Sequence, residues 1–297
     1  MKQFIKSILP APMLDAIQHS RQFNKRVAER YARTSKRIDI CSAQLAHYLH
    51  LSKHAPLEGK VCLEVGSGWV LSHAVVCYLL GAARVIATDI FPFAQPQALR
   101  TAVRNSISYL PRDILSAFAS HSLMRNRFDR LLSIRRFSFD ALKELGIEYI
   151  APFDFGKAAL DVPVDFVYSI SAFEHVPCGD IAMVMKNIVV NLNPGGTMIH
   201  CIHLEDHQDS LNHPFGFLSV AADDFSPSVQ SQRGNRIRRS RWRELFGSLE
   251  NTTSRYIYEW TREDRPIPAR IDPSIVYKDE ADLRVSHIGV YTEKMRS

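Results

Sequence analysis

One stretch of about 30 residues constrains the fold more than any other part of the sequence. Lys60–Val65 is a short apolar run that ends at Gly66-Ser67-Gly68. Leu71–Leu80 then carries a helical apolar pattern, and Arg84–Ile90 is a second short apolar run. A strand, a helix and another strand at this spacing predict a βαβ unit, which requires a parallel sheet.

Further strands and helices follow the same alternation. Strands are predicted from Tyr149–Ile150 onward and over Asp165–Ile170, Thr197–His203, Arg255–Trp260 and Val285–Thr292. A helix is predicted over Asp180–Leu192, followed by a turn at Asn193–Gly196. Ser240 is expected to cap a helix whose Trp242, Leu245, Phe246 and Leu249 share one face. We therefore predict an α/β fold with a Rossmann-like, seven-stranded, mostly parallel sheet and helices on both faces.

The chain is expected to form a single domain with additions to a minimal core. Residues 1–56 form a helical N-terminal extension, with a basic amphipathic helix over Met13–Tyr31 and a second helix over Lys36–His50. Residues 57–90 and 147–204 form the core, and 251–297 hold the last strands. Residues 91–146 are a helical insertion and 205–250 a substrate-side loop and helix. Both of these exceed what connections require, so we assign them to substrate binding.

Composition excludes several classes of protein. Among 297 residues, 46% are apolar and 23% charged, which is typical of a globular chain. The longest apolar stretch, near Val70–Leu80, is too short to span a bilayer, and residues 1–10 lack a signal-peptide core. Five scattered cysteines form no C-x-x-C pair. We expect a cytoplasmic protein, with the N-terminal helix as the segment that would touch a membrane.

The glycine loop carries acidic residues that decide what it can bind. A glycine turn between a strand and a helix lets a ligand approach the backbone. Asp89, at the end of the second strand, can accept hydrogen bonds from both ribose hydroxyls. A dinucleotide fits poorly, because Leu71 replaces the third glycine of G-x-G-x-x-G and Glu64 would repel the pyrophosphate. S-adenosylmethionine has no phosphate and carries two cationic groups, so Glu64 favours it.

Asp154, after the third strand, completes a pattern with Glu64, the glycines and Asp89. Over about Leu57–Leu204 this pattern resembles the class I S-adenosylmethionine-dependent methyltransferases, although Val70 stands where a third glycine often occurs. The resemblance implies that Glu64 and the glycines hold the methionine end, that Asp89 binds the ribose, and that Ile90, Phe153 and Asp154 surround the adenine. The predicted cofactor-binding residues are Glu64, Gly66, Ser67, Gly68, Asp89, Ile90, Phe153, Asp154 and Ser169.

The segment after the fourth strand bears on what is methylated. It lacks the Asn/Asp-Pro-Pro-aromatic motif of enzymes that methylate nucleic-acid amino groups, and Cys178 is interpreted as an ordinary helix-start residue. Phe173-Glu174-His175-Val176 resembles the small-molecule branch of the family, which includes quinone, sterol, sugar and natural-product enzymes. His175 would then lie near the transferred methyl group, where it either takes a hydroxyl proton or fixes the loop by a hydrogen bond.

A histidine-rich segment leaves the fifth strand, with His200, His203, His207 and His213 in close succession. Three interpretations stay open. His203 or His207 deprotonates the acceptor, a divalent metal binds His203, Asp206 and His207, or the loop is polar with ordinary hydrogen bonds. The first is favoured and the metal ranks last, so no metal ligand is predicted.

The later segment Asn235-Arg236-Ile237-Arg238, taken with the histidines and Trp242, is similar to bacterial methyltransferases found with glycosyltransferases of surface-polysaccharide assembly. This resemblance implies a saccharide or nucleotide-sugar acceptor, with Arg236 and Arg238 binding a phosphate or uronate. The alternative role of these arginines is to pair with acids of the protein.

We therefore expect an S-adenosylmethionine-dependent methyltransferase that O-methylates a saccharide or nucleotide-sugar hydroxyl, with His175, His203 and His207 as catalytic candidates. The alternatives are methylation of another small molecule or of RNA, and a non-catalytic protein that keeps the fold. Arginine clusters at 125–136 and 233–243 suit RNA, but aromatic residues are not interleaved with them as in stacking surfaces. The expected partner is a small-molecule or glycan acceptor, not a nucleic acid.

Overall fold

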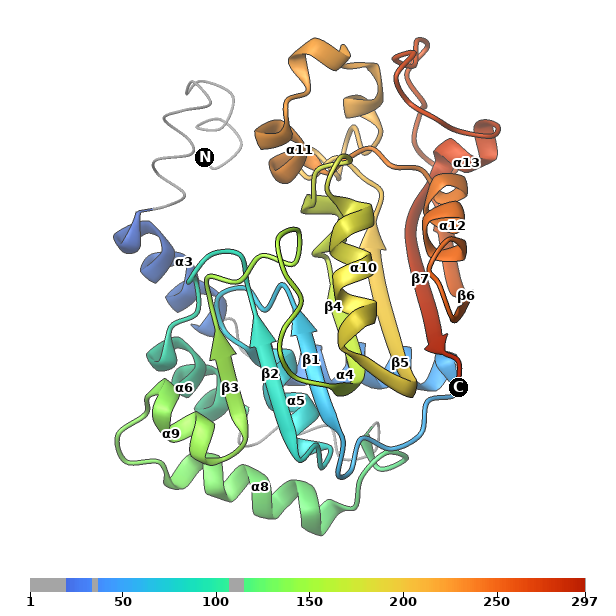
Figure 1. Ribbon diagram of the computed structural model, residues 1–297. Coiled ribbons are helices and arrows are strands. Elements are labelled where there is room, and N and C mark those ends of the chain that lie inside the picture. Colours follow the sequence, from blue (N-terminus) through green and yellow to red (C-terminus); the bar gives the residue numbers. More distant parts are fainter. Residues whose placement is uncertain (1–19, 34–36, 107–114, 297) are drawn as a thin grey trace.

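The computed structural model describes residues 20–33, 37–106 and 115–296. A seven-stranded sheet in the order β3-β2-β1-β4-β5-β7-β6 runs through them (Figure 1). Its strands are β1 (Val61–Val65), β2 (Arg84–Thr88), β3 (Ile147–Ile150), β4 (Val164–Ile170), β5 (Leu192–His203), β6 (Thr252–Thr261) and β7 (Val285–Lys294). Within this sheet β7 runs antiparallel to β5 and β6, and the other pairs are parallel. The predicted Rossmann-like, mostly parallel seven-stranded sheet is confirmed.

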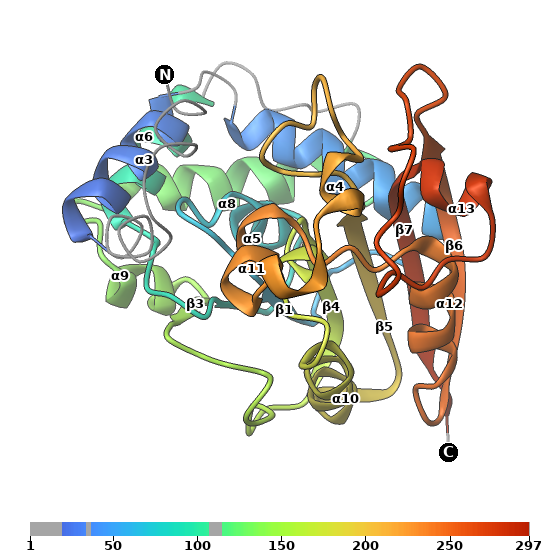
Figure 2. The ribbon, with the colours of Figure 1, turned by 90° about the horizontal axis from the view of Figure 1, so that it is seen from above.

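Helices cover both faces of the sheet, as the view from above shows (Figure 2). They are α3 (Arg21–Arg33), α4 (Arg37–Ser52), α5 (Ser72–Leu79), α6 (Pro96–Asn105), α8 (His121–Ser133), α9 (Phe139–Glu144), α10 (Ile181–Asn191), α11 (Pro227–Arg233), α12 (Arg239–Gly247) and α13 (Glu280–Arg284), with short 3₁₀ turns η1 (Phe173–His175), η2 (Gly216–Ser219) and η3 (Ala222–Asp224). One core cluster lies under α4, α5, α6 and α8, and another under α10 and α12. A sheet covered on both faces explains why its parallel strands are nearly continuous apolar runs.

The most apolar part of the sequence is the central helix α5. Every residue from Ser72 to Leu79 is buried between the sheet and its neighbours α4 and α8. This burial accounts for the apolar run near Val70–Leu80. In the part of the chain that the structure describes, no helix is both long enough and apolar enough to cross a membrane.

The predicted elements need three corrections, and one further prediction lies partly outside the described residues. The first residues of the helix predicted over Met13–Tyr31 lie outside the described residues. The third strand ends at Ile150 and does not begin at Tyr149. Asn193–Gly196 forms a bulge within β5, because Leu192 pairs with Val164 and Thr197 already pairs with Phe166. Ser240 does not cap α12.

The start of α12 is held from a distant part of the chain. The residue at the cap position is Arg238, and its side chain makes no capping hydrogen bond. The backbone N–H of Ser240 instead donates to Oδ1 of Asp282 at 2.9 Å, and the Ser240 hydroxyl donates to Oδ2. Trp242, Leu245 and Phe246 are buried as their spacing predicts. The helix is therefore placed by its apolar face and by Asp282.

The described parts of the helical insertion, residues 91–106 and 115–146, lie mostly away from the carboxyl ends of the parallel strands (Figure 1). Helix α8 packs against α5 at the end of the sheet where the parallel strands begin (Figure 1). The Arg127 guanidinium donates to the carbonyl oxygens of Tyr78 and Ala82 at 2.7 Å and to that of Gly81 at 3.2 Å. This part of the insertion thus closes the end of α5.

The strand order changes direction between β1 and β4, so connections from these two strands leave to opposite sides of the sheet. In open α/β sheets, ligands bind outside the carboxyl ends of the strands at such a point. Helix α11 lies over this edge and contacts η1 (Figures 1 and 2). A ligand-binding site is therefore expected between the glycine loop after β1 and the segment after β4.

Candidate functional site

The glycine loop is a tight backbone turn. The N–H groups of Gly66 and Ser67 both donate to the carbonyl oxygen of Thr88 at 3.0 Å. Gly66 and Gly68 have φ angles of 80° and 64°, a left-handed conformation that favours glycine. A Cβ on Gly66 would lie 2.6 Å from Cβ of Ala172, whereas a Cβ on Gly68 would meet nothing within 4 Å. The loop thus packs against the segment after β4 at Gly66 and leaves space at Gly68.

This difference predicts different effects for alanine at the two glycines. Gly66→Ala should destabilise the protein by about 2 kcal/mol more than Gly68→Ala, because both pay for a left-handed residue but only the first also displaces Ala172. Urea unfolding of both variants measures the difference. Equal losses of stability would show that Ala172 moves away without cost.

Asp89 joins β2 to the glycine loop. Its Oδ2 accepts from the N–H of Gly68 at 2.8 Å, and its Oδ1 accepts from the N–H of Phe91 at 3.1 Å. Each carboxylate oxygen has two acceptor positions, so Asp89 keeps capacity for further donors. Burial raises its pKa above the ordinary value, and the N–H groups of Phe91 and Gly68 oppose this effect. Asp89 therefore holds the loop and still offers acceptors.

Glu64 lies at the end of β1, just before the loop. Its side chain is almost fully buried, with 3% of the residue exposed. Its Oε1 is 3.7 Å from Nδ1 of His73, and its Oε2 has no hydrogen-bond partner among the described residues. Burial raises the pKa of Glu64 to about 8 and lowers that of His73 to about 3. A carboxylate in this position lacks a strong cationic partner.

The other predicted cofactor residues divide into two groups. Ile90 is half exposed beside Asp89. The N–H of Phe153 donates to the Asp89 carbonyl oxygen at 2.8 Å. The residues predicted to surround the adenine therefore meet at the carboxyl ends of β2 and β3. Asp154 accepts from the N–H of Gly156 and pairs with Lys157 at 3.2 Å. Ser169 is different, because its buried hydroxyl bonds Nδ1 of His200 at 2.8 Å. The structure therefore does not offer the Ser169 hydroxyl to a ligand.

Aromatic residues that the sequence analysis did not single out line this end of the site. Trp69, directly after the loop, stacks on Tyr31 of α3 and on Phe93, with ring centroids 5.5 and 5.3 Å apart. Phe91 contacts Phe93 in turn. The only local signals were the position of Trp69 next to Gly68 and of Phe91 and Phe93 shortly after Asp89.

The predicted catalytic histidines lie together at the ends of β4 and β5. Ring centroids of His175 and His207 are 4.6 Å apart, and those of His207 and His203 are 5.6 Å apart. His287 of β7 extends the group, 4.0 Å from His203, because the two residues pair in register across β5 and β7. We call these four residues the histidine group. His287 was missed, because only the strand register brings it there.

Burial lowers the pKa of two members of this group. It lowers the pKa of His203 to about 3, with His287, His207 and His175 adding to the effect. Burial also lowers the pKa of His287 to about 4. His200 is fully inside the core, stacked on Phe173 at 4.2 Å, and is structural. His203 and His287 are therefore weak bases.

Glu174 is a buried acid beside the histidine group, and its sequence position predicted no role for it. It is 1% exposed, and neither carboxylate oxygen has a hydrogen-bond partner among the described residues. Its Oε1 lies 3.6 Å from Nε2 of His207. Burial raises the pKa of Glu174 to about 8. The only sequence signal was its place in Phe173-Glu174-His175-Val176.

The segment around Asn235 fixes Glu174 and His175 in space. The Asn235 N–H donates to the carbonyl oxygen of Glu174 at 2.8 Å, and its side-chain amide donates to those of Phe173 and Val176. Nδ1 of His175 bonds the carbonyl oxygen of Ser231 at 2.8 Å. Residues far along the chain thus hold η1 by its backbone.

The two arginines expected to bind substrate are structural. Arg238 is fully buried, and its guanidinium donates to the carbonyl oxygens of Leu204, Leu283 and Val285. Arg236 donates to the carbonyl oxygens of Phe217 and Val220 and stacks 3.8 Å from the Phe225 ring. Backbone carbonyl groups accept hydrogen bonds from both guanidinium groups, and that of Arg236 also contacts an aromatic ring. The expectation that they grip an anionic substrate does not agree with this geometry.

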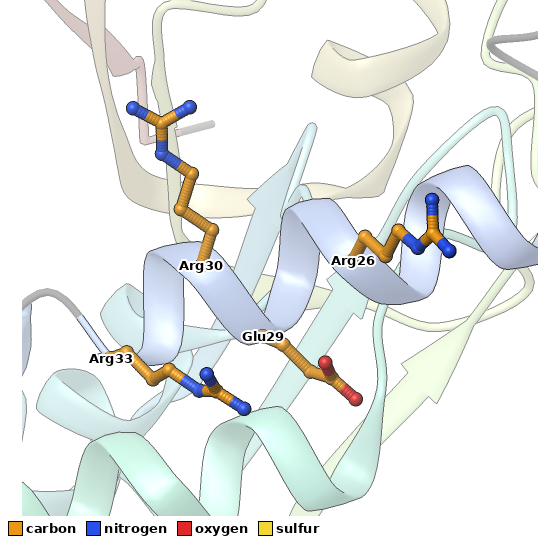
Figure 3. Close-up of a pocket in the computed structure, with 4 residues that line it drawn as sticks. All are labelled: Arg26, Glu29, Arg30 and Arg33. Atoms are coloured by element: carbon orange, nitrogen blue, oxygen red, sulfur yellow. The ribbon is translucent and has the colours of Figure 1, made fainter.

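A surface hollow of about 340 Å³ lies on α3. Arg26, Glu29, Arg30 and Arg33 line it, all from one helix (Figure 3). It contains none of the residues described above.

Comparisons with known proteins concern the fold. No protein-family model matches the sequence, and no curated protein matches it. One similar solved structure is the CurJ carbon methyltransferase, with 10% identity and a TM-score of 0.44 over 91% of this chain and 57% of that one. Another is an O-methyltransferase family protein from Burkholderia thailandensis, with 9% identity and a TM-score of 0.47 over 95% of this chain and 62% of that one. This chain therefore spans about three fifths of both proteins.

The plantazolicin methyltransferase BpumL, solved in complex with SAH, is similar over a larger share of its length. It has 10% identity and a TM-score of 0.47, covering 95% of this chain and 93% of its own. At such identities the likeness concerns the fold alone.

Proposed function

We propose that this chain binds S-adenosylmethionine at the carboxyl ends of β1 and β2 and transfers its methyl group to a small-molecule acceptor. The observation that carries the proposal is Glu64, a buried carboxylate with an unpartnered oxygen immediately before a glycine loop. A buried carboxylate is costly unless a cation or donors accompany it. The ammonium and sulfonium groups of S-adenosylmethionine would supply that charge, whereas a pyrophosphate would be repelled.

The surrounding residues fit the rest of this cofactor. The space at Gly68 would admit the methionine end, and Asp89 would accept from the ribose hydroxyls. Ile90, Phe153 and Asp154 would border the adenine. The bound cofactor supplies a methyl group already activated on sulfur, so the task of the protein is to align the acceptor and exclude water.

The histidine group supports a hydroxyl as the acceptor. Gly66 packs against Ala172, which lies two residues before Glu174, so the cofactor loop and the histidine group adjoin. In the proposed step the O–CH₃ bond forms as the S–CH₃ bond breaks, and the hydroxyl proton passes to His175 or His207. A saccharide or nucleotide-sugar acceptor is the finer proposal. It rests on the sequence resemblance and does not involve Arg236 or Arg238.

A calorimetric titration tests the cofactor part of the proposal. The purified chain should bind S-adenosylmethionine with a dissociation constant in the micromolar range and should not bind NAD⁺. Binding of NAD⁺ alone would contradict the proposal. Incubation with labelled S-adenosylmethionine and a panel of nucleotide sugars and glycans then tests the acceptor, since transfer adds one methyl group to the product.

Glu64 predicts proton release when the cofactor binds. Its raised pKa of about 8 leaves it protonated at pH 7 in the free protein, and a bound cation would ionise it. Affinity should therefore rise with pH, by up to about tenfold per unit, and level off above pH 8. Calorimetry in buffers of different ionisation enthalpy counts the protons. Glu64→Gln should abolish the release, and equal release by both proteins would contradict the assignment.

A further inference from the structure

We propose that Glu174, His175 and His207 bind one divalent transition-metal ion. Each residue offers one ligand atom, and these atoms all lie within 4.8 Å of one another. Ligands of one ion at about 2.1 Å lie about 3 to 4.2 Å apart, so small side-chain rotations would complete the site. The ligands come from η1 and from the segment after β5, and the two histidines are members of the histidine group.

The burial of Glu174 favours a cation at this position. Its carboxylate is 1% exposed, and both oxygens lack hydrogen-bond partners among the described residues. The 3.6 Å between its Oε1 and Nε2 of His207 is too long for a hydrogen bond but close to the separation of two ligands on one ion. A metal ion would supply both the charge and the bonds that this carboxylate lacks.

His175 is oriented as a ligand. Its Nδ1 lies 2.8 Å from the carbonyl oxygen of Ser231, and a carbonyl only accepts, so Nδ1 carries the proton. The lone pair is then on Nε2. A hydrogen bond from the second imidazole nitrogen to a backbone carbonyl is the usual support of metal-binding histidines.

The donor set selects the kind of ion. Two imidazoles and one carboxylate suit zinc, manganese, iron or cobalt better than magnesium or calcium, which prefer oxygen ligands. Three protein ligands also leave positions open for oxygens of another molecule. If the proposed function holds, the open positions would bind the acceptor hydroxyl and lower its pKa, and its proton would pass to solvent in place of His175 or His207, whose lone pairs bind the metal. Metal binding itself does not depend on that function.

Cobalt(II) tests the site directly, because its visible absorption reports its ligands. Untagged protein, stripped with a chelator, is titrated with Co²⁺ without cofactor or acceptor. We expect saturation at one equivalent, and Glu174→Gln should weaken binding about 100-fold. His213→Gln is the matched control, since it removes a histidine from the same segment but not from the three ligands. It should leave the affinity unchanged.

Thermal unfolding separates loss of a ligand from loss of the fold. Without metal, Glu174→Gln should be at least as stable as the parent protein, because the amide has nearly the same shape and, unlike the carboxyl group, does not ionise when the chain unfolds. Zinc should raise the melting temperature of the parent and not of Glu174→Gln. If that variant does not fold, His207→Gln takes its place. Absence of saturable Co²⁺ absorption, or equal affinity in parent and variants, would overturn the metal site and leave the S-adenosylmethionine titration unaffected.

Discussion

Replacing Asp89 by alanine is expected to weaken the binding of S-adenosylmethionine about 100-fold. Two hydrogen bonds from the ribose to a carboxylate would be lost, and each contributes about 1.5 kcal/mol or more. Asp89 also accepts from the N–H groups of Gly68 and Phe91, so the variant loses part of the support of the loop. Calorimetric titration of the variant measures the loss of affinity.

A conservative variant separates these two roles of Asp89. Asp89→Asn keeps one acceptor oxygen and should show an intermediate affinity. Asp129→Ala is the control, because Asp129 is a half-exposed acid on α8 that pairs with Arg125 far from the loop. It should bind as the parent does. If Asp89→Ala bound S-adenosylmethionine with the affinity of the parent protein, Asp89 would not contact the ribose.

Replacing Arg238 by methionine is expected to destabilise the protein by about 3–5 kcal/mol. The substitution keeps an apolar stem but leaves three buried carbonyl oxygens without their donor, those of Leu204, Leu283 and Val285. Burial lowers the pKa of Arg238 only to about 10, so the side chain is charged at neutral pH. Urea unfolding monitored by circular dichroism gives the loss.

Two further variants distinguish this structural role from a surface charge. Arg238→Lys should recover only part of the stability, because one ammonium cannot reach three carbonyl oxygens that a planar guanidinium bridges. Arg241→Met, on the exposed side of the same helix, removes an ion pair with Glu244 and should change stability by about 0.5 kcal/mol or less. Equal effects of Arg238→Met and Arg241→Met would show that the buried bonds contribute little.

The strand–glycine–helix–strand unit could be predicted because its signals are local. Apolar runs of strand length, two glycines and an acid at each strand end occur within one short stretch, and parallel strands bring their carboxyl ends to one edge. The same rule brought Glu64, Asp89 and the segment 153–154 together. The placement of His175, His203 and His207 followed from it as well, since they lie at or just after the ends of the neighbouring strands β4 and β5.

Other parts of the site could not be predicted, since they depend on contacts between distant segments. Arg238 looks like a surface residue in the sequence, but carbonyl groups from β7 and the end of β5 surround it. His287 joins the histidine group only through its register opposite His203. Asp282, not Ser240, holds the start of α12.

By itself the sequence determined the α/β class, the mostly parallel sheet and the edge at which ligands are expected. Periodicity, turn residues and the alternation of elements encode these features within short windows. Only the tertiary structure decided which polar side chains are available there. Burial isolates Glu174 and Glu64 from other partners and encloses Arg238 and Ser169, and burial depends on the packing of segments that are far apart in the chain.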